Sequence, residues 1–178
     1  MTEFPYLTVF LLEIEDLLAL PQVQRMRSFP QHGTTNCLYH CLYVAYLCYR
    51  ISRRLHLHAH QMARAALLHD LFLYDWHDPS HPRWHGLHHP RYALENAQRL
   101  VPLTAREKNT ILRHMWPLTP VPPRYAEGLI LVLIDKYCTL LETFRFAKKY
   151  ERLAAACRLP GPAGSPEKLS PERVSPEK

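Results

Sequence analysis

Glycine is scarce in this chain, which has only five glycines against 16 prolines in 178 residues. This ratio argues against a loop-rich β-sandwich and favours helices interrupted by proline. No segment alternates apolar and polar residues over a length that predicts a sheet. Because 47% of the residues are hydrophobic, the chain still has enough apolar material for the core of one domain.

Long apolar runs and paired cysteine motifs are also missing. The longest unbroken aliphatic run, Leu129 to Ile134, is far too short to cross a bilayer. The N-terminus has neither the basic run nor the cleavage site of a signal peptide. The five cysteines are odd in number and lack CxxC spacing, which argues against a disulfide framework and for a reducing compartment. We therefore expect a soluble, cytoplasmic protein without a membrane partner.

Charge divides the chain into a body and a tail. The net charge of +6 belongs wholly to the body, because the segment from Pro160 carries three bases and three acids. This excess favours an anionic ligand but is modest for a nucleic-acid binder, so no stable nucleic-acid complex is expected. The tail repeats Ser-Pro-Glu-basic at Ser165, Ser170 and Ser175 with almost nothing apolar. We predict one helical domain over residues 1–158 and a disordered tail over 159–178.

Apolar periodicity predicts an all-α fold. An irregular loop is expected over Tyr74 to His88, and Thr104 with Glu107 forms a capping box at a helix start. The predicted helices are 7–20, 21 to about 30, 35–55, 58–70, 90–100, 104–114 and 124–153.

Histidine is abundant, with 12 in the chain and nine of them between His56 and His89. Three short motifs place such residues on apolar helical faces: His40 in CLYHCLYVAYLCY, the dipeptide His69-Asp70, and Asp135 in LILVLIDKYCTLL. A carboxylate buried like Asp135 must be paired, hydrogen-bonded or bound to metal. The alternative for Asp135 is a salt bridge with an arginine of another helix. Together, imidazoles and carboxylates form a mixed donor set suited to Mn, Fe, Co, Ni, Zn or Mg.

The pattern H…HD…D resembles the HD-domain superfamily of metal-dependent phosphohydrolases. It maps onto His40, His69, Asp70 and Asp135, with 29 residues between the histidines and 65 between the aspartates. The resemblance covers roughly residues 31–142 and is strongest to small bacterial members of the family. It implies a compact multi-helix bundle with a divalent metal in its helical core, four protein ligands leaving positions for water and substrate.

Two further histidines resemble the dinuclear version of this pattern, H…HD…H…H…D. If His89 and His114 bind, Asp70 bridges two metals, with His40, His69 and Asp135 on the other side. The alternative is that both are helix-capping or loop histidines. The Gly-Tyr-Pro motif of the HD-GYP phosphodiesterases is absent from the sequence, so their cyclic dinucleotide specificity does not carry over.

Several further residues are candidates for catalysis or substrate binding around the expected metal. Asp70 is the central catalytic residue, and His85 and Asp75 are candidates for contact with the substrate or proton transfer. Lys136, His32 and Arg124 are candidates for substrate binding, the two cations by clamping a phosphate. The cluster of His56, His58 and His60 is instead read as a solvated turn.

The sequence thus predicts a hydrolase of phosphate esters, acting on a nucleotide or another small phosphorylated metabolite through a metal-activated water. Two alternatives stay open at this point. One is a di-iron oxygenase of the HD fold, such as myo-inositol oxygenase, and the other is a ligand-binding HD module without turnover. A homo-oligomer is compatible with the sequence.

Overall fold

The computed structural model describes residues 3–31, 35–79, 84–144 and 148–159, and these ranges contain helices and no strand. The predicted all-α class is confirmed. The helical segments are α1 (Leu7–Leu12), α2 (Glu15–Leu18), α3 (Pro21–Arg25), the 3-10 turn η1 (Met26–Ser28), α4 (Cys37–Arg54), α5 (Ala59–Leu68), α6 (His85–Leu100), α7 (Ala105–Arg113), α8 (Ala126–Thr143) and α9 (Lys148–Ala156). Within them, no helix combines the length and the apolarity needed to cross a membrane.

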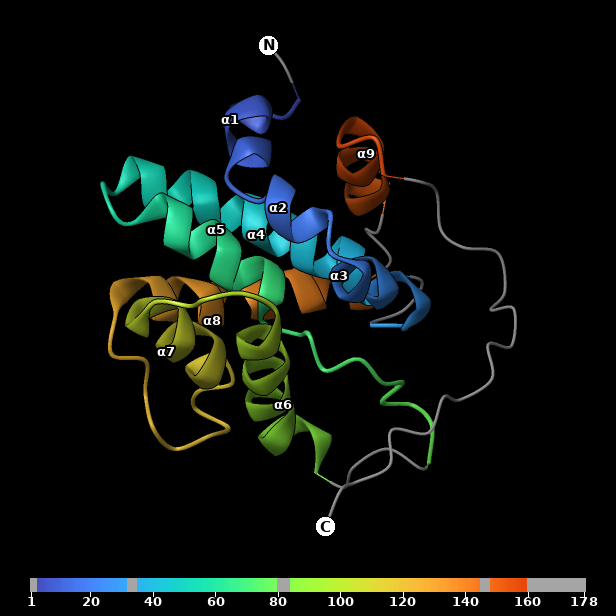
Figure 1. Cartoon of the computed structure of the whole chain (residues 1–178), viewed down its shortest axis with the longest axis vertical. Helices are drawn as coiled ribbons and strands as arrows, with labels where there is room; N and C mark the ends of the chain where they lie inside the picture. Colours follow the sequence, from blue (N-terminus) through green and yellow to red (C-terminus); the bar gives the residue numbers. More distant parts are fainter. Residues whose placement is uncertain (1–2, 32–34, 80–83, 145–147, 160–178) are drawn as a thin grey trace.

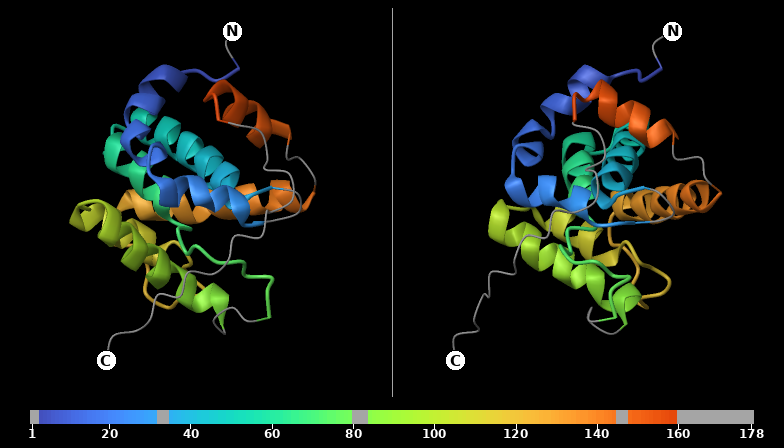
Figure 2. Two further views of the ribbon diagram at one scale, coloured as in Figure 1. Left: turned by 45° about the vertical axis from the view of Figure 1, so that its right-hand side comes forward. Right: turned by 90° about the vertical axis from the view of Figure 1, so that its right-hand side faces the viewer.

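The helices α4 and α5 form the centre of the molecule and lie side by side (Figures 1 and 2). The buried side of α5 combines large residues with small ones, and the fully buried Ala63 and Ala66 leave room for close packing. Helix α4 is buried on most of its circumference. Its Tyr46 and Tyr49 pack against Phe10 of α1 with ring centroids 5.5 Å apart.

Helices α6, α7 and α8 complete the bundle. Helix α7 packs on α5, α6 and α8, and α8 also packs along α4. The predicted capping box starts α7: Thr104 Oγ1 accepts from the backbone N–H of Glu107, while Glu107 Oε2 accepts from that of Thr104 at 2.7 Å. The same buried glutamate lies 3.5 Å from Arg64 of α5. This contact links the middle of α5 to the first turn of α7.

The start of α6 differs from the prediction. Helix α6 begins at His85, one turn before the predicted start at Pro90, so part of the expected loop is helical. Pro90 lies inside the helix near its N-terminus, where the missing N–H affects a single backbone hydrogen bond.

The predicted helix 124–153 is also wrong, because α8 ends at Thr143 and α9 begins at Lys148. Tyr150 of α9 packs on Tyr43 of α4, with ring centroids 4.4 Å apart, and its hydroxyl donates to the Cys138 carbonyl of α8, a contact that a continuous straight helix could not make. The predicted helix 7–20 is likewise divided, into α1 and α2. The tail from residue 160 onwards lies outside the described residues.

Candidate metal centre

Six predicted ligands come together in the interior from five helices. His40 comes from the first turn of α4, His89 from α6 and Asp135 from the middle of α8. His69 and His114 are the C-cap residues of α5 and α7, and Asp70 follows His69 directly. All six are buried, the most exposed being Asp135 at 8%. The sequence predicted this set, and the structure brings it together.

Hydrogen bonds hold the imidazoles in one tautomer. Three histidines donate from Nδ1 to a carbonyl of their own helix: His69 to Ala66 at 2.7 Å, His89 to His85 at 3.0 Å and His114 to Ile111 at 2.8 Å. A carbonyl oxygen can only accept, so Nδ1 of each ring carries a proton, and Nε2 is the nitrogen that offers a lone pair when the ring is neutral. His40 Nδ1 lies 2.8 Å from Glu142 Oε1, a carboxylate oxygen that can accept in the same way. All four Nε2 atoms are therefore left for the centre, where the neutral rings could serve as metal ligands.

The first group of donors consists of His40, His69 and Asp135. Asp135 Oδ1 lies 3.1 Å from His40 Nε2 and 3.6 Å from His69 Nε2. The second group consists of Asp70, His89 and His114. Asp70 Oδ1 lies 3.2 Å from His89 Nε2 and 3.5 Å from His114 Nε2, and the two nitrogens are 2.9 Å apart. In each group the three ligand atoms lie close enough together to hold one ion.

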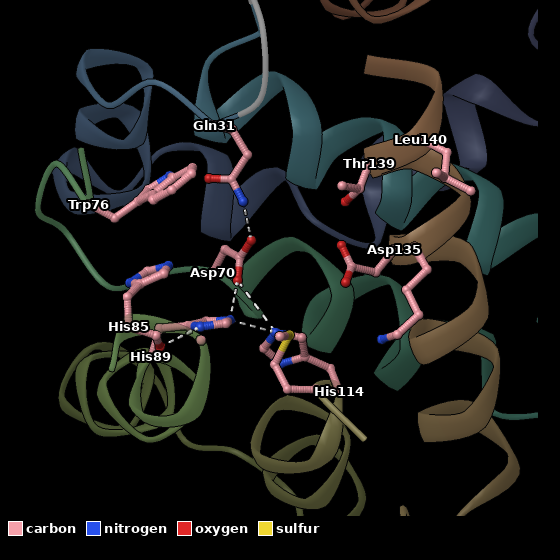
Figure 3. A pocket seen from close by; sticks show the side chains of 12 residues that line it. Gln31, Asp70, Trp76, His85, His89, His114, Asp135, Thr139 and Leu140 are labelled. Carbon is pink, nitrogen blue, oxygen red and sulfur yellow. Dashed lines mark hydrogen bonds and ion pairs between the residues drawn. The ribbon is translucent and has the colours of Figure 1, made fainter. Parts of the chain in front are cut away.

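Asp70 lies between the two groups. Its Oδ1 faces the second group, while its Oδ2 lies 3.4 Å from His69 Nε2 and 4.0 Å from His40 Nε2. Gln31 Nε2 donates to Oδ2 at 2.5 Å and fixes the orientation of the carboxylate (Figure 3). A single carboxylate can therefore serve both groups, one oxygen to each.

The donor atoms fit divalent ions. Ligands bound about 2.0–2.1 Å from one ion at tetrahedral or octahedral angles lie roughly 2.9–3.4 Å from each other. The separations within the two groups cluster around that range. Two buried atoms, His69 Nε2 and Asp70 Oδ1, have no hydrogen-bond partner among the described residues, and both face the centre. The lone pairs of His89 and His114, 2.9 Å apart, repel each other unless a cation or a proton lies between them.

Cys41 forms a third grouping with His69 and Asp70. Burial raises the pKa of the Cys41 thiol well above its ordinary value of 9.0. The thiolate is the form that binds metal, so Cys41 would have to release its proton on binding, as His40 and His69 would release theirs. The grouping of His40, His69 and Asp135 uses the same imidazole and carboxylate donors as the second group.

The pKa values show that this cluster favours positive charge. Burial lowers the pKa of His40, but Glu142 and Asp135 outweigh it and raise that pKa well above 6.5. Burial likewise lowers the pKa of His69, and the adjacent Asp70 raises it above 6.5 overall. Burial raises the pKa values of Asp70 and Asp135, yet the neighbouring histidines bring both below 3.8. In the metal-free protein, protons on His40 and His69 supply the positive charge that a metal ion would otherwise bring.

A cavity of about 570 Å³ opens over the cluster. Its wall contains ligands from both groups together with His85 and Lys136, which the sequence proposed for catalysis and substrate binding. The remaining wall is largely apolar, with Trp76 and Leu140 on opposite sides of Asp70 (Figure 3). His85 is the first residue of α6, its Nδ1 lies 2.8 Å from the Tyr74 hydroxyl, and its ring is nearly parallel to that of Trp76.

Other proposed site residues lie elsewhere. Asp75 is half-buried and accepts a hydrogen bond from the backbone N–H of His77 at 2.9 Å, and it is not among the residues of the cavity wall. The guanidinium of Arg124, which precedes the start of α8, lies over the Tyr125 ring and is also outside that wall. The geometry therefore does not support the roles assigned to these two residues. His32 lies outside the described residues.

Sequence reasoning missed two residues that contact the ligands. Glu142 holds His40, and it could have been found from its spacing: it follows Asp135 by seven residues, two helical turns on the same face. Gln31 holds Asp70 from an extended segment, and no local pattern marks it.

Comparison of the chain with protein-family models, with curated proteins and with solved structures finds no match in any of the three. What the chain shows is therefore its own geometry: buried His/Asp groupings, inside an all-α bundle, that could hold metal ions.

Proposed function

We propose that this protein is a metal-dependent phosphohydrolase that holds two divalent ions and cleaves a small phosphate ester. One observation carries the proposal: two groups of buried donors share the Asp70 carboxylate at the floor of an open cavity. The match of His40, His69, Asp70 and Asp135 to the H…HD…D pattern of the HD-domain phosphohydrolases supports the same reading.

The six ligands would hold the ions, which when bound supply Lewis-acid activation of a phosphoryl oxygen and of a water nucleophile. The chain's own residues supply the rest. Lys136, the one basic residue among the described lining residues other than histidine, attracts the phosphoryl group into the cavity as a point charge. The reaction forms a P–O bond to water and breaks the ester P–O bond, so the leaving oxygen needs a proton.

His85 is placed to give that proton. The Tyr74 phenol, whose pKa burial raises to about 12, stays protonated, and its oxygen lies 2.8 Å from His85 Nδ1. In the imidazolium form of His85, Nδ1–H would donate to this oxygen and Nε2–H would give its proton to the leaving oxygen, which returns the ring to its neutral form. His85 would thus act as a proton donor toward the substrate rather than as a further ligand. Trp76, Met115 and Leu140 form the apolar wall that limits water around the reacting group.

Metal content tests the site. Protein purified without chelator should contain about two divalent ions per chain by elemental analysis. His89→Ala and His114→Ala should each lower this to about one, because they remove ligands of the second group only. His58→Ala, which removes an exposed histidine outside both groups, is the matched control and should retain both ions. Retention of two ions in His89→Ala would contradict the assignment of the second group.

Turnover tests the chemistry. Phosphate release should be measured across a panel of phosphate monoesters and nucleotides. His85→Ala should lower kcat with the metal content unchanged, and Lys136→Ala should raise KM, while Arg124→Ala should change neither. Two bound irons with oxygen consumption and no phosphate release would favour the oxygenase alternative. Metal without any turnover would favour a binding module.

A further inference from the structure

Helix α8 has an outward face that is unusually apolar. Its exposed large side chains, with the C-cap residue included, are Leu129 (43%), Leu133 (68%), Tyr137 (49%), Leu140 (58%) and Phe144 (69%). Among the residues of α8, all of which the structure describes, Lys136 is the one charged side chain in the exposed class. The exposed face of a helix in a monomeric protein is normally polar, so this face indicates contact with a partner.

The spacing of the apolar face is that of a helix–helix seam. Leu133, Tyr137, Leu140 and Phe144 follow one another at intervals of four, three and four residues, which is the heptad spacing of coiled coils. A seam of this kind is symmetric about its own midpoint, between Tyr137 and Leu140. An antiparallel second copy would place Leu133 opposite the partner's Phe144 and Tyr137 opposite the partner's Leu140.

We propose that two copies of this chain pair through the α8 seam, defined as Leu133, Tyr137, Leu140 and Phe144, in an antiparallel, two-fold arrangement. A two-fold interface requires a surface that is complementary to a second copy of itself, and the α8 seam meets this requirement. The two Lys136 side chains are not placed opposite each other, because antiparallel pairing offsets them by about 7.5 Å along the helix axis.

The area is sufficient for a dimer. At roughly 150–250 Å² for a large side chain, the exposed portions of Leu129 and the seam amount to about 600 Å² per copy. A pair would bury about 1,200 Å², the lower end of specific interfaces, so we expect a reversible dimer.

Other occupants fit less well. The chain's own segment from residue 160 onwards contains Leu169 and Val174 as its large aliphatic residues, too little to cover the seam. A membrane-binding helix normally carries several basic residues beside its apolar face, and α8 exposes one.

The proposed dimer interface would also extend to the rim of the cavity. Leu140 belongs to both the seam and the cavity wall, and Lys136 lies beside it. A second copy would therefore stand at the rim of each cavity. The inference does not depend on the proposed function, because it rests on exposed residues outside the metal ligands.

Sedimentation velocity of the full, metal-loaded chain over a wide concentration range tests the proposal. The wild type should pass from monomer to dimer, and Leu133→Glu should be monomeric throughout. Leu55→Glu is the matched control: Leu55, at the end of α4, is 58% exposed, and its variant should dimerise like the wild type. Unchanged melting temperature and metal content in Leu133→Glu would show that the fold is intact.

A charge pair tests the register. Phe144→Glu alone should be monomeric, whereas Leu133→Lys combined with Phe144→Glu places each lysine opposite the partner's new carboxylate and should restore the dimer. A wild type that stays monomeric, or dimers that survive Leu133→Glu, would overturn the proposal. Binding of the wild type to vesicles of anionic phospholipid, lost in Leu133→Glu while the protein remains monomeric, would assign the seam to a membrane instead.

Discussion

Replacement of Glu142 tests whether His40 is a metal ligand. The His40 Nδ1–H donates to Glu142 Oε1 over 2.8 Å with both side chains fully buried. A hydrogen bond to a charged group is worth roughly 1.5–3 kcal/mol. Loss of a carboxylate behind a ligand histidine typically lowers metal affinity 10- to 100-fold, about 1.4–2.8 kcal/mol. The two ranges agree, so this one contact should be visible in a binding measurement.

Two variants separate charge from hydrogen bonding. Glu142→Gln keeps an acceptor oxygen but removes the charge, so we expect a loss of about tenfold in affinity. Glu142→Leu removes the acceptor as well and leaves a buried N–H unpaired, so we expect a loss nearer 100-fold and a destabilisation of about 1–3 kcal/mol. Competition of Zn²⁺ or Co²⁺ between the protein and a chromophoric chelator measures the affinity.

Glu127→Gln is the matched control. Glu127 is a buried glutamate on the same helix, held by Arg106 at 2.8 Å and by the backbone N–H of His58, far along α8 from the ligands. Its replacement should lower stability without changing metal affinity. Wild-type affinity in both Glu142 variants would refute the assignment of His40 as a ligand.

Three further outcomes are expected. Asp70→Ala should reduce the metal content to near zero by elemental analysis, since Asp70 faces both donor groups, whereas His58→Ala should keep the full metal content. An Asp70→Ala protein with full metal content would contradict the assignment of Asp70 as a ligand. In the metal-free protein, the raised pKa values of His40 and His69 stabilise the fold below pH 6.5, and this is lost as pH rises through them. The lowered pKa values of Asp70 and Asp135 stabilise it above pH 3.8, and this is lost as pH falls through them. Denaturant titrations should therefore show the largest stabilisation by these groups between pH 3.8 and 6.5. Calorimetry near pH 7 should show that metal binding releases protons, and binding without proton release would contradict this expectation. Thr104→Ala should cost about 1 kcal/mol and lower Tm by roughly 2–4 °C, because the α7 capping box is lost; an unchanged Tm would show that α7 is held by packing alone.

Much of the ligand set could be predicted because helical periodicity is a local property. His40 and Asp135 stand among apolar residues at helical spacing, so their burial follows from the sequence. The dipeptide His69-Asp70 directly follows an apolar helix, so the sequence predicts that it lies at a buried helix end. The capping box at Thr104 and Glu107 is equally local, and the structure contains it.

Other features depend on contacts between distant segments. The spacing of Glu142 to Asp135 places both on one helical face, but which face is buried, and that Glu142 meets His40 there, follows from the packing of α8 on α4. Asp75 resembles a catalytic acid by its neighbours, yet it lies outside the cavity wall to which the adjacent Trp76 belongs. The division between α8 and α9 follows from the fit of Tyr150 against α4, which no local pattern contains.

The hydrogen bonds from Nδ1 to carbonyls of the same helix have a consequence for entropy. Each ring of His69, His89 and His114 loses its rotational freedom when its own helix forms, before any ion arrives. The cost of ordering these side chains is therefore part of the folding free energy rather than of the binding free energy. An incoming ion meets nitrogens that already converge. When an ion leaves, these side chains keep the orientation in which Nε2 faces the centre, so the site can bind another ion without first ordering them.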